Sequence, residues 1–143
     1  MSNKIAGFLF AAVFSFALAQ TVIATVPFKG NGIGQITGGV PGVSLTGVAT
    51  GNATHLGRYT RTETILLGAG GTFTGDVTFT AANGDLLTAD IAGAFTSLTT
   101  ASGTYTFTGG TGRFEGATGT AFFSVELLDA GQFTVAFNGT LDK

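Results

Sequence analysis

Apolar and hydroxylated side chains alternate along most of this chain with a period of two residues. In residues 71–80, Phe73 and Phe79 fall on one face of the segment, and a series of threonines falls on the other. This alternation is typical of a β-strand with one buried face. Residues 104–108 and 132–138 repeat it, and no apolar pattern of helical period follows the first 24 residues. The pattern predicts an all-β protein.

Eight such segments lie between short glycine-rich turns. We expect strands at residues 25–30, 43–50, 55–65, 72–81, 85–95, 103–108, 118–128 and 132–141. The pair Asn83-Gly84 predicts a type I′ hairpin turn, because both residue types tolerate a positive φ. With no helices to cover it, a sheet of this size removes its exposed edges by closing on itself. The predicted fold is a single eight-stranded antiparallel β-barrel.

The apolar face of the predicted strands is rich in aromatic residues and would form the barrel interior. Its members are Phe73, Val77, Phe79, Tyr105, Phe107, Phe123, Val125, Phe133, Val135 and Phe137. Such an interior either packs as a filled core, which is the favoured alternative, or lines a narrow cavity. The other face carries Thr, Asp, Asn and Gln, and the chain has no Trp. The apolar outer band and aromatic girdles of an outer-membrane barrel are therefore missing.

The first 19 residues differ from the rest of the chain. Lys4 is followed by the apolar residues 5–16, and Ala17-Leu18-Ala19 fits the small-x-small site at which signal peptides are cleaved. We therefore expect a signal peptide at residues 1–19 and one barrel domain at residues 20–143, in a secreted or periplasmic protein. The apolar run is too short to favour a membrane anchor. The absence of cysteine favours a bacterial source.

Charge and composition exclude several classes of partner. The chain has 6 Lys and Arg against 8 Asp and Glu, with no basic cluster, so we do not expect it to bind nucleic acid. Beyond the leader, no segment approaches the ~20 apolar residues of a membrane-spanning helix. His55 is the only histidine and cysteine is absent, which leaves no common zinc ligand set, and no cofactor is expected. The glycine run at residues 30–34 lacks the Lys-Ser/Thr of a phosphate-binding loop and is interpreted as a turn or bulge.

The glycine-rich segment before the seventh predicted strand reads Thr108-Gly109-Gly110-Thr111-Gly112-Arg113-Phe114-Glu115-Gly116-Ala117-Thr118-Gly119. It resembles a segment shared by plant allene oxide cyclases and dirigent proteins. Residues 51–60 and 78–85 resemble bacterial secreted proteins of the allene-oxide-cyclase-barrel type, and the likeness spans residues 26–141. The resemblance implies an eight-stranded antiparallel barrel with an apolar interior, often trimeric in the plant members. It transfers no catalytic residue to this chain.

Several side chains are candidates for binding a ligand inside the barrel. The polar candidates are Arg58, Tyr59, Tyr105 and Glu126, and the apolar ones are Phe73, Phe79 and Phe107. No residue is predicted to be catalytic, and His55 is expected to cap the end of a strand.

Three charged residues follow one another closely on the third predicted strand. Arg61 and Glu63 share one face of that strand and Arg58 lies on the other. The favoured interpretation is solvated ion pairing, which stabilises a protein by less than about 1 kcal/mol. The alternative is a buried arginine that orients an acidic ligand.

The sequence leaves three functions open. The favoured one is a non-enzymatic binder of a small hydrophobic ligand, or an envelope or matrix component. The second is an isomerase or cyclase without a cofactor, similar to allene oxide cyclase or dirigent proteins, which confines and orients an apolar substrate. The third is adhesion to ice or to a polysaccharide through Thr-x-Thr rows such as Thr60, Thr62 and Thr64. Threonine on a solvated strand face is also what β-propensity alone favours.

Overall fold

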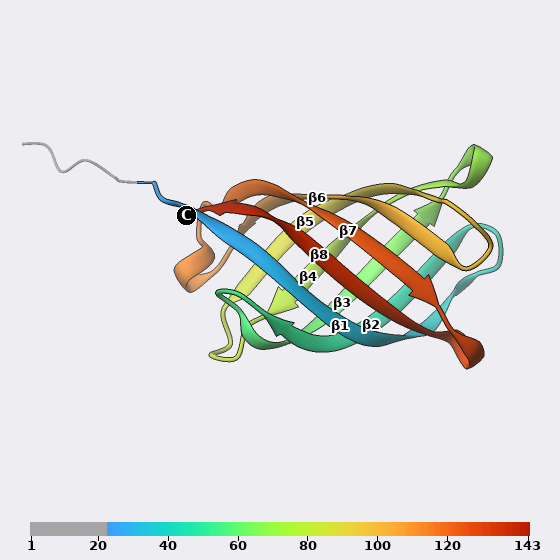
Figure 1. Cartoon of the computed structure of the whole chain (residues 1–143), viewed down its shortest axis with the longest axis horizontal. Coiled ribbons are helices and arrows are strands. Elements are labelled where there is room, and N and C mark those ends of the chain that lie inside the picture. The colour runs from blue at the N-terminus through green and yellow to red at the C-terminus, as the bar shows by residue number, and fades with distance from the viewer. Residues whose placement is uncertain (1–22) are drawn as a thin grey trace, which may run out of the picture.

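Alternating buried and exposed side chains along eight strands produce a closed antiparallel barrel in the computed structural model, which describes residues 23–143 (Figure 1). The strands are β1 (Thr25–Val40), β2 (Ser44–Ala53), β3 (Gly57–Leu67), β4 (Thr72–Thr80), β5 (Leu86–Phe95), β6 (Thr100–Gly110), β7 (Thr118–Leu127) and β8 (Gln132–Asp142). Each strand pairs with the next in sequence, and β1 also pairs with β8. The predicted all-β fold with eight antiparallel strands is confirmed. The predicted signal peptide lies outside the described residues.

The connections between strands contain little other structure. The described residues hold three 3₁₀ turns of three residues each, at Ala69–Gly71, Gly112–Phe114 and Asp129–Gly131. Within residues 23–143, no helix has the length and apolar character needed to cross a membrane.

β1 is much longer than predicted, because its glycine run is not a turn. The strand continues through residues 30–34 to Val40, and its register against β2 shifts once, between Ile36 and Gly38. Gly30, Gly32 and Gly34 face the interior, where a Cβ on Gly32 would lie 2.5 Å from the hydroxyl oxygen of Tyr59. These glycines give larger side chains from other strands room to pack against the backbone.

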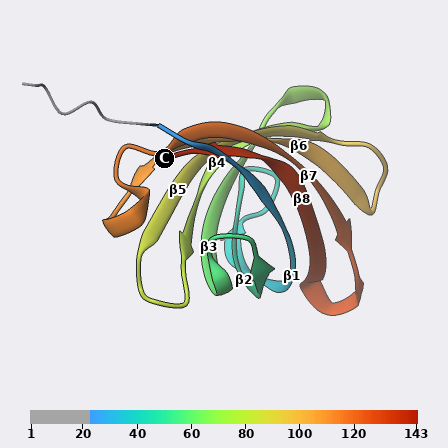
Figure 2. The ribbon, with the colours of Figure 1, turned by 60° about the vertical axis from the view of Figure 1, so that its left-hand side comes forward.

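The barrel interior is asymmetric as a result. The inward positions of β1 and β2 include a run of very small residues: Gly30, Gly32, Gly34, Gly47, Ala49 and Gly51. The other strands contribute most of the large inward side chains, and of these Tyr59 and Phe133 lie against this wall. The predicted interior residues are all buried, apart from Val125, which is half-buried. Figure 2 shows how strongly the strands curve around this core.

Aromatic side chains fill the half of the barrel nearest the pair Thr25 and Asp142. Phe28, which is fully buried, lies 4.9 Å from Phe107 and 5.2 Å from Phe137, measured between ring centroids. Phe79 lies 5.9 Å from Phe28 in an edge-on arrangement. Aromatic pairs of this kind each contribute about 0.5–1.5 kcal/mol beyond the burial of their area. This half of the barrel is a packed core.

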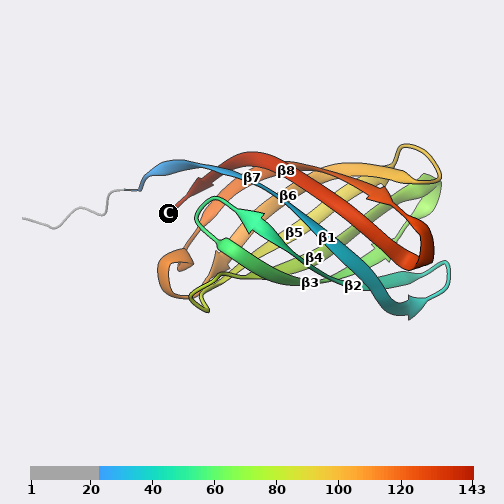
Figure 3. The ribbon, with the colours of Figure 1, turned by 60° about the horizontal axis from the view of Figure 1, so that its bottom comes forward.

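The connection between β6 and β7 closes the end of the barrel at which Thr25 of β1 pairs with Asp142 of β8 (Figure 3). Phe114 in this connection is fully buried. Arg113 forms an ion pair with Asp85 at 3.3 Å and donates a hydrogen bond to the carbonyl oxygen of His55 at 3.0 Å. The segment that carries the family resemblance is thus a plug for this end, which we call the closed end.

Two local predictions at the closed end are wrong. Asn83 does not have a positive φ; Gly84 alone does, at 94°, and the turn is a three-residue loop rather than type I′. The side-chain oxygen of Asn83 accepts a hydrogen bond from the backbone N–H of Asp85 at 3.0 Å, which stabilises this loop. The third strand does not begin at residue 55 as expected. His55 has φ of 64° and lies in the turn between β2 and β3, so β3 begins at Gly57.

Candidate ligand-binding site

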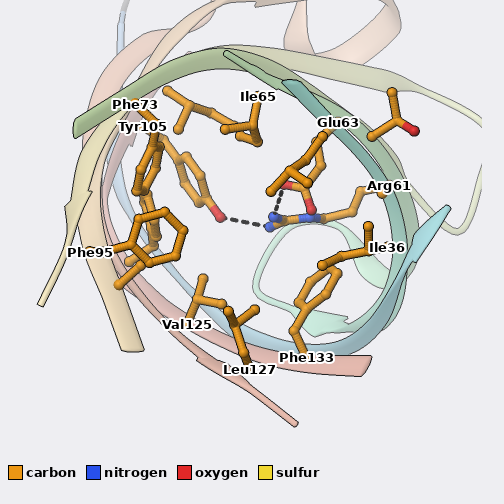
Figure 4. Close-up of a pocket in the computed structure, with 16 residues that line it drawn as sticks. Ile36, Arg61, Glu63, Ile65, Phe73, Phe95, Tyr105, Val125, Leu127 and Phe133 are labelled. Atoms are coloured by element: carbon orange, nitrogen blue, oxygen red, sulfur yellow. Dashed lines mark hydrogen bonds and ion pairs between the residues drawn. The ribbon is translucent and has the colours of Figure 1, made fainter. Parts of the chain in front are cut away.

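The opposite end of the barrel, which we call the open end, contains a cavity (Figure 4). Its volume is about 80 Å³, and all eight strands contribute lining residues. A cavity of about 10–15 Å³ is enough to hold a single water molecule. Sites for drug-sized ligands reach about 300–1,000 Å³. The cavity is therefore suited to a small molecule, or to one end of a larger one.

The walls of the cavity are mostly apolar. They include Ile36, Ile65, Phe73, Phe95, Val125, Leu127 and Phe133. Figure 4 shows these side chains in a ring around the barrel axis, with Arg61 and Glu63 on one side and Tyr105 on the other, its hydroxyl pointing towards Arg61. An apolar wall with a few converging polar groups is the usual composition of a small-molecule site.

Arg61 is the buried charged group of this cavity, with only 3 % of the residue exposed. It points inward because Tyr59, Arg61, Glu63 and Ile65 alternate along the same face of β3. Its Nη1 donates a hydrogen bond to the hydroxyl oxygen of Tyr105 at 2.7 Å, and its Nη2 donates to Oε2 of Glu63 at 2.5 Å. We call Arg61, Glu63 and Tyr105 the polar triad.

The surroundings of Arg61 keep it charged. Burial opposes the charge, but the Tyr105 oxygen and the Glu63 carboxylate outweigh burial and raise the pKa of Arg61 above its ordinary value. The guanidinium carbon also lies 5.4 Å from the ring centroid of Phe79 and 5.6 Å from that of Tyr105. Such cation–π contacts stabilise a desolvated cation.

The polar triad has hydrogen-bonding capacity to spare. Nε of Arg61 is buried and has no hydrogen-bond partner among residues 23–143. The Tyr105 oxygen accepts from Arg61, while its own O–H hydrogen has no acceptor in that part of the chain. Oε1 of Glu63 accepts no hydrogen bond from that part of the chain, because Oε2 is the oxygen that accepts from Arg61. At least two donors, Nε–H of Arg61 and O–H of Tyr105, and one acceptor, Oε1 of Glu63, are therefore left unmatched by residues 23–143.

Two buried tyrosines differ in their relation to the cavity. Tyr105 lines it, whereas Tyr59 lies outside it and donates a hydrogen bond to the carbonyl oxygen of Asn31 at 3.0 Å. Burial raises the pKa of Tyr59 to about 12. Burial also raises the pKa of Tyr105, against the opposing charge of Arg61. Both side chains are neutral hydroxyl groups at neutral pH.

The predicted site residues fall into three groups in the structure. Tyr105 and Phe73 line the cavity. Tyr59, Phe79 and Phe107 are buried in the barrel but do not line the cavity. Arg58 and Glu126 are exposed on the outer wall, so their assignment to the interior is wrong. On β3 and β7 the inward positions are odd-numbered, and an even-numbered side chain points to solvent.

The favoured interpretation of Arg61 and Glu63 as a solvated pair is also wrong. The side chain of Arg61 is 2 % exposed and that of Glu63 is 10 % exposed. The alternative of a buried arginine describes the geometry, but Glu63 already pairs with the charge. The alternation along β3 was the signal that could have identified this pair, because it places both residues on the face of Tyr59.

Exposed apolar side chains surround the open end. Val40 and Val43 lie at the connection of β1 with β2, Leu98 between β5 and β6, and Leu128 between β7 and β8. Leu98 is 96 % exposed. Together with Leu66 near the end of β3, they place apolar surface around the entrance to the cavity. We call these five residues the apolar rim.

The described residues suggest no metal centre. Within residues 23–143, no group of three or more His, Cys, Asp or Glu side chains is arranged to hold a metal ion. His55 lies in a turn, where burial and the charges of Lys143 and Arg113 lower its pKa.

Comparison with known proteins identifies the fold and not the family. No protein-family model matches the chain, and no curated protein matches it. Among solved structures, the chain is similar to the pterocarpan synthase dirigent protein GePTS1, with a TM-score of 0.59 and 12 % sequence identity. The similarity covers 87 % of this chain and 88 % of that one. The chain thus has a dirigent-like barrel fold, as the sequence resemblance implied.

Proposed function

We propose that this protein binds a small, mainly apolar molecule in the cavity at its open end, with the polar part of the molecule against the polar triad. The observation that carries this proposal is a hydrogen-bonded charge pair buried beside apolar walls. A buried ion pair is weak evidence for stability, because apolar side chains of similar volume often stabilise a protein as well or better. The packed core beside it shows that the rest of this barrel is filled with such side chains. Recognition of a ligand accounts for the polar triad, whereas a contribution to stability does not.

The apolar rim supports entry at the open end. A ligand with little polarity would meet exposed valine and leucine side chains before it reaches the cavity. The opposite end is closed by Phe114 and the residues around it. The expected signal peptide would place this binding activity outside the cytoplasm.

A dirigent-like reaction is the second candidate function. The solved structure with a similar fold is described as a pterocarpan synthase, and an apolar cavity with a few converging polar groups would confine and orient a reactive substrate. Product formation from a bound ligand would distinguish this candidate from simple binding.

The outer wall gives less support to adhesion through threonine rows. Thr60, Thr62 and Thr64 are exposed on β3, as expected. Across the sheet each of them has a threonine as one partner: Thr60 pairs with Thr50 and Thr80, Thr62 with Thr78, and Thr64 with Thr46. The rows are nevertheless interrupted, because Thr62 also pairs with Val48 and Thr64 with Asp76. The wall is also curved, whereas an ordered lattice needs a flat surface (Figure 2).

The proposal is tested by native mass spectrometry of the exported protein purified from its host, followed by thermal shift measurements with a panel of small apolar compounds. We expect a co-purifying molecule, or a rise in Tm with at least one compound. Absence of both in repeated preparations would overturn the proposal.

Gly47 offers a matched pair of variants for the same test. A Cβ at Gly47 would lie 3.4 Å from Oε1 of Glu63 and 3.5 Å from Cε1 of Phe133, which are ordinary contacts. Gly47→Val therefore fills part of the cavity without a clash at Cβ, and ligand binding should weaken. Val48→Thr changes the neighbouring outward-facing position and should leave binding unchanged.

A further inference from the structure

We infer that the cavity selects a neutral ligand that carries a hydroxyl group, an alcohol or a phenol, and rejects the corresponding carboxylate. This inference rests on the proposed binding function and adds the chemical class of the ligand.

The first argument is the charge already present in the site. Arg61 and Glu63 form an ion pair, so the polar triad has no net charge to offer a ligand. A carboxylate placed there would lose its hydration and lie near the Glu63 carboxylate, with an arginine whose charge is already matched. An ionised group that is buried without its own counter-charge is strongly disfavoured. An isolated buried arginine would favour an acid, but Glu63 reverses that preference.

The second argument is the set of unmatched hydrogen-bonding groups. Nε–H of Arg61 and O–H of Tyr105 are donors without an acceptor among residues 23–143, and Oε1 of Glu63 is an acceptor without a donor there. A hydroxyl group both accepts and donates, so it can satisfy a member of each kind. An ether or carbonyl oxygen can only accept. A buried donor without an acceptor, such as Nε–H of Arg61, is costly, and a ligand that accepts from a donor of the site while it donates to Glu63 gains the most.

The test compares three probes with one ring and different polar groups: toluene, benzyl alcohol and benzoate. Their affinities for the exported wild-type protein are measured by chemical-shift titration at pH 7. We expect benzyl alcohol to bind roughly tenfold or more tightly than benzoate, which corresponds to about 1.4 kcal/mol. Toluene should bind more weakly than the alcohol, because it leaves the donors and the acceptor unmatched.

Glu63→Gln tests the origin of the preference. This substitution removes the negative charge and leaves Arg61 unbalanced, so the affinity for benzoate should rise and the order of benzyl alcohol and benzoate should reverse. Tyr105→Phe removes one unmatched donor and should weaken benzyl alcohol binding while leaving toluene unchanged. Tyr59→Phe is the control, since it removes a buried hydroxyl outside the cavity.

The outcomes separate this inference from the proposed function. If the wild-type protein binds benzoate as tightly as benzyl alcohol, the selectivity is wrong while the binding function stands. If toluene, benzyl alcohol and benzoate all fail to shift any cavity resonance, the proposed site itself is wrong for ligands of this size. Should Glu63→Gln fail to fold, the wild-type comparison of alcohol with acid still decides the inference.

Discussion

The hydroxyl oxygen of Tyr105 on β6 accepts a hydrogen bond from Nη1 of Arg61 on β3 at 2.7 Å, across the inside of the barrel. These two strands are not neighbours in the sheet, so no backbone hydrogen bond joins them. The contact therefore couples opposite walls of the barrel through side chains alone. It also provides an acceptor for a guanidinium that has little contact with solvent.

Loss of this acceptor should destabilise the protein more than loss of a neutral buried hydroxyl. Tyr105→Phe removes a hydrogen bond to a charged donor, and we expect it to lower the free energy of unfolding by about 1.5–3 kcal/mol. Tyr59→Phe removes a bond to a backbone carbonyl, and about 1 kcal/mol is expected. Urea denaturation of both variants measures the difference. Equal losses would show that the Arg61 contact contributes no more than the neutral one.

The ion pair should be costly to break and inexpensive to replace. Glu63→Leu leaves Arg61 buried without its counter-charge, and we expect a loss of about 3 kcal/mol in the free energy of unfolding. The double variant Arg61→Met/Glu63→Leu removes both charges and should recover to within about 1 kcal/mol of the wild type. A double-mutant cycle with Arg61→Met completes the measurement. Additive single effects would contradict this account of the pair.

Alkaline pH should unfold the barrel through its buried tyrosines. Burial raises the pKa of Tyr59 from 10.0 to about 12, and it raises the pKa of Tyr105 in the same direction. The folded state thus holds protons that the unfolded state releases first, so the contribution of the tyrosines to stability is constant below pH 10 and is lost between pH 10 and pH 12. Tyrosinate absorbance recorded with circular dichroism checks this. Ionisation of both tyrosines near pH 10 in a folded protein would contradict it.

The two ends of the barrel should respond differently to loss of an apolar side chain. Phe114 is fully buried at the closed end, and Phe114→Ala is expected to lower the free energy of unfolding by about 3–5 kcal/mol. Leu98 belongs to the apolar rim, and Leu98→Ala should change stability by less than about 0.5 kcal/mol. Thermal or urea denaturation provides both values. A stable Phe114→Ala variant would mean that the plug is not part of the cooperative core.

The glycines of the β1–β2 wall should not be equivalent. A Cβ on Gly32 would meet the Tyr59 hydroxyl at 2.5 Å and the backbone oxygen of Thr50 at 2.8 Å, whereas a Cβ on Gly47 meets nothing closer than 3.4 Å. Gly32→Ala should therefore cost about 1–3 kcal/mol through overpacking. Gly47→Ala should be tolerated, with a change below about 1 kcal/mol. Denaturant midpoints of the two variants test this ordering.

The barrel and most of its core could be predicted because their signal is repeated alternation. Phe73, Phe107 and Phe137 are buried as the period of two requires. The extension of β1 could not be predicted in this way, because glycine at an inward position has no apolar side chain to mark the buried face. Residues 30–34 therefore resemble a turn in the sequence. In the structure their inward-facing glycines leave space for the side chains of Tyr59 and Phe133.

The candidate site was predicted only in part. Tyr105 and Phe73 were identified as interior residues from their strands, and both line the cavity. Arg58 and Glu126 are candidates by their chemistry alone, and both face solvent because the inward positions of β3 and β7 are odd-numbered. The sequence favours a solvated ion pair for Arg61 and Glu63, since charged side chains are rarely buried. The sequence does not show that Tyr105, 44 residues away, provides the acceptor that makes this burial tolerable.

The position of the closed end has a practical consequence. Ala24 and Lys143 exchange two backbone hydrogen bonds there, at 3.1 and 3.0 Å. A linker attached next to either residue would hold the protein to a bead or sensor surface with the cavity entrance pointing away from the support. Immobilised protein should thus remain accessible to dissolved compounds, whichever of these two residues carries the attachment.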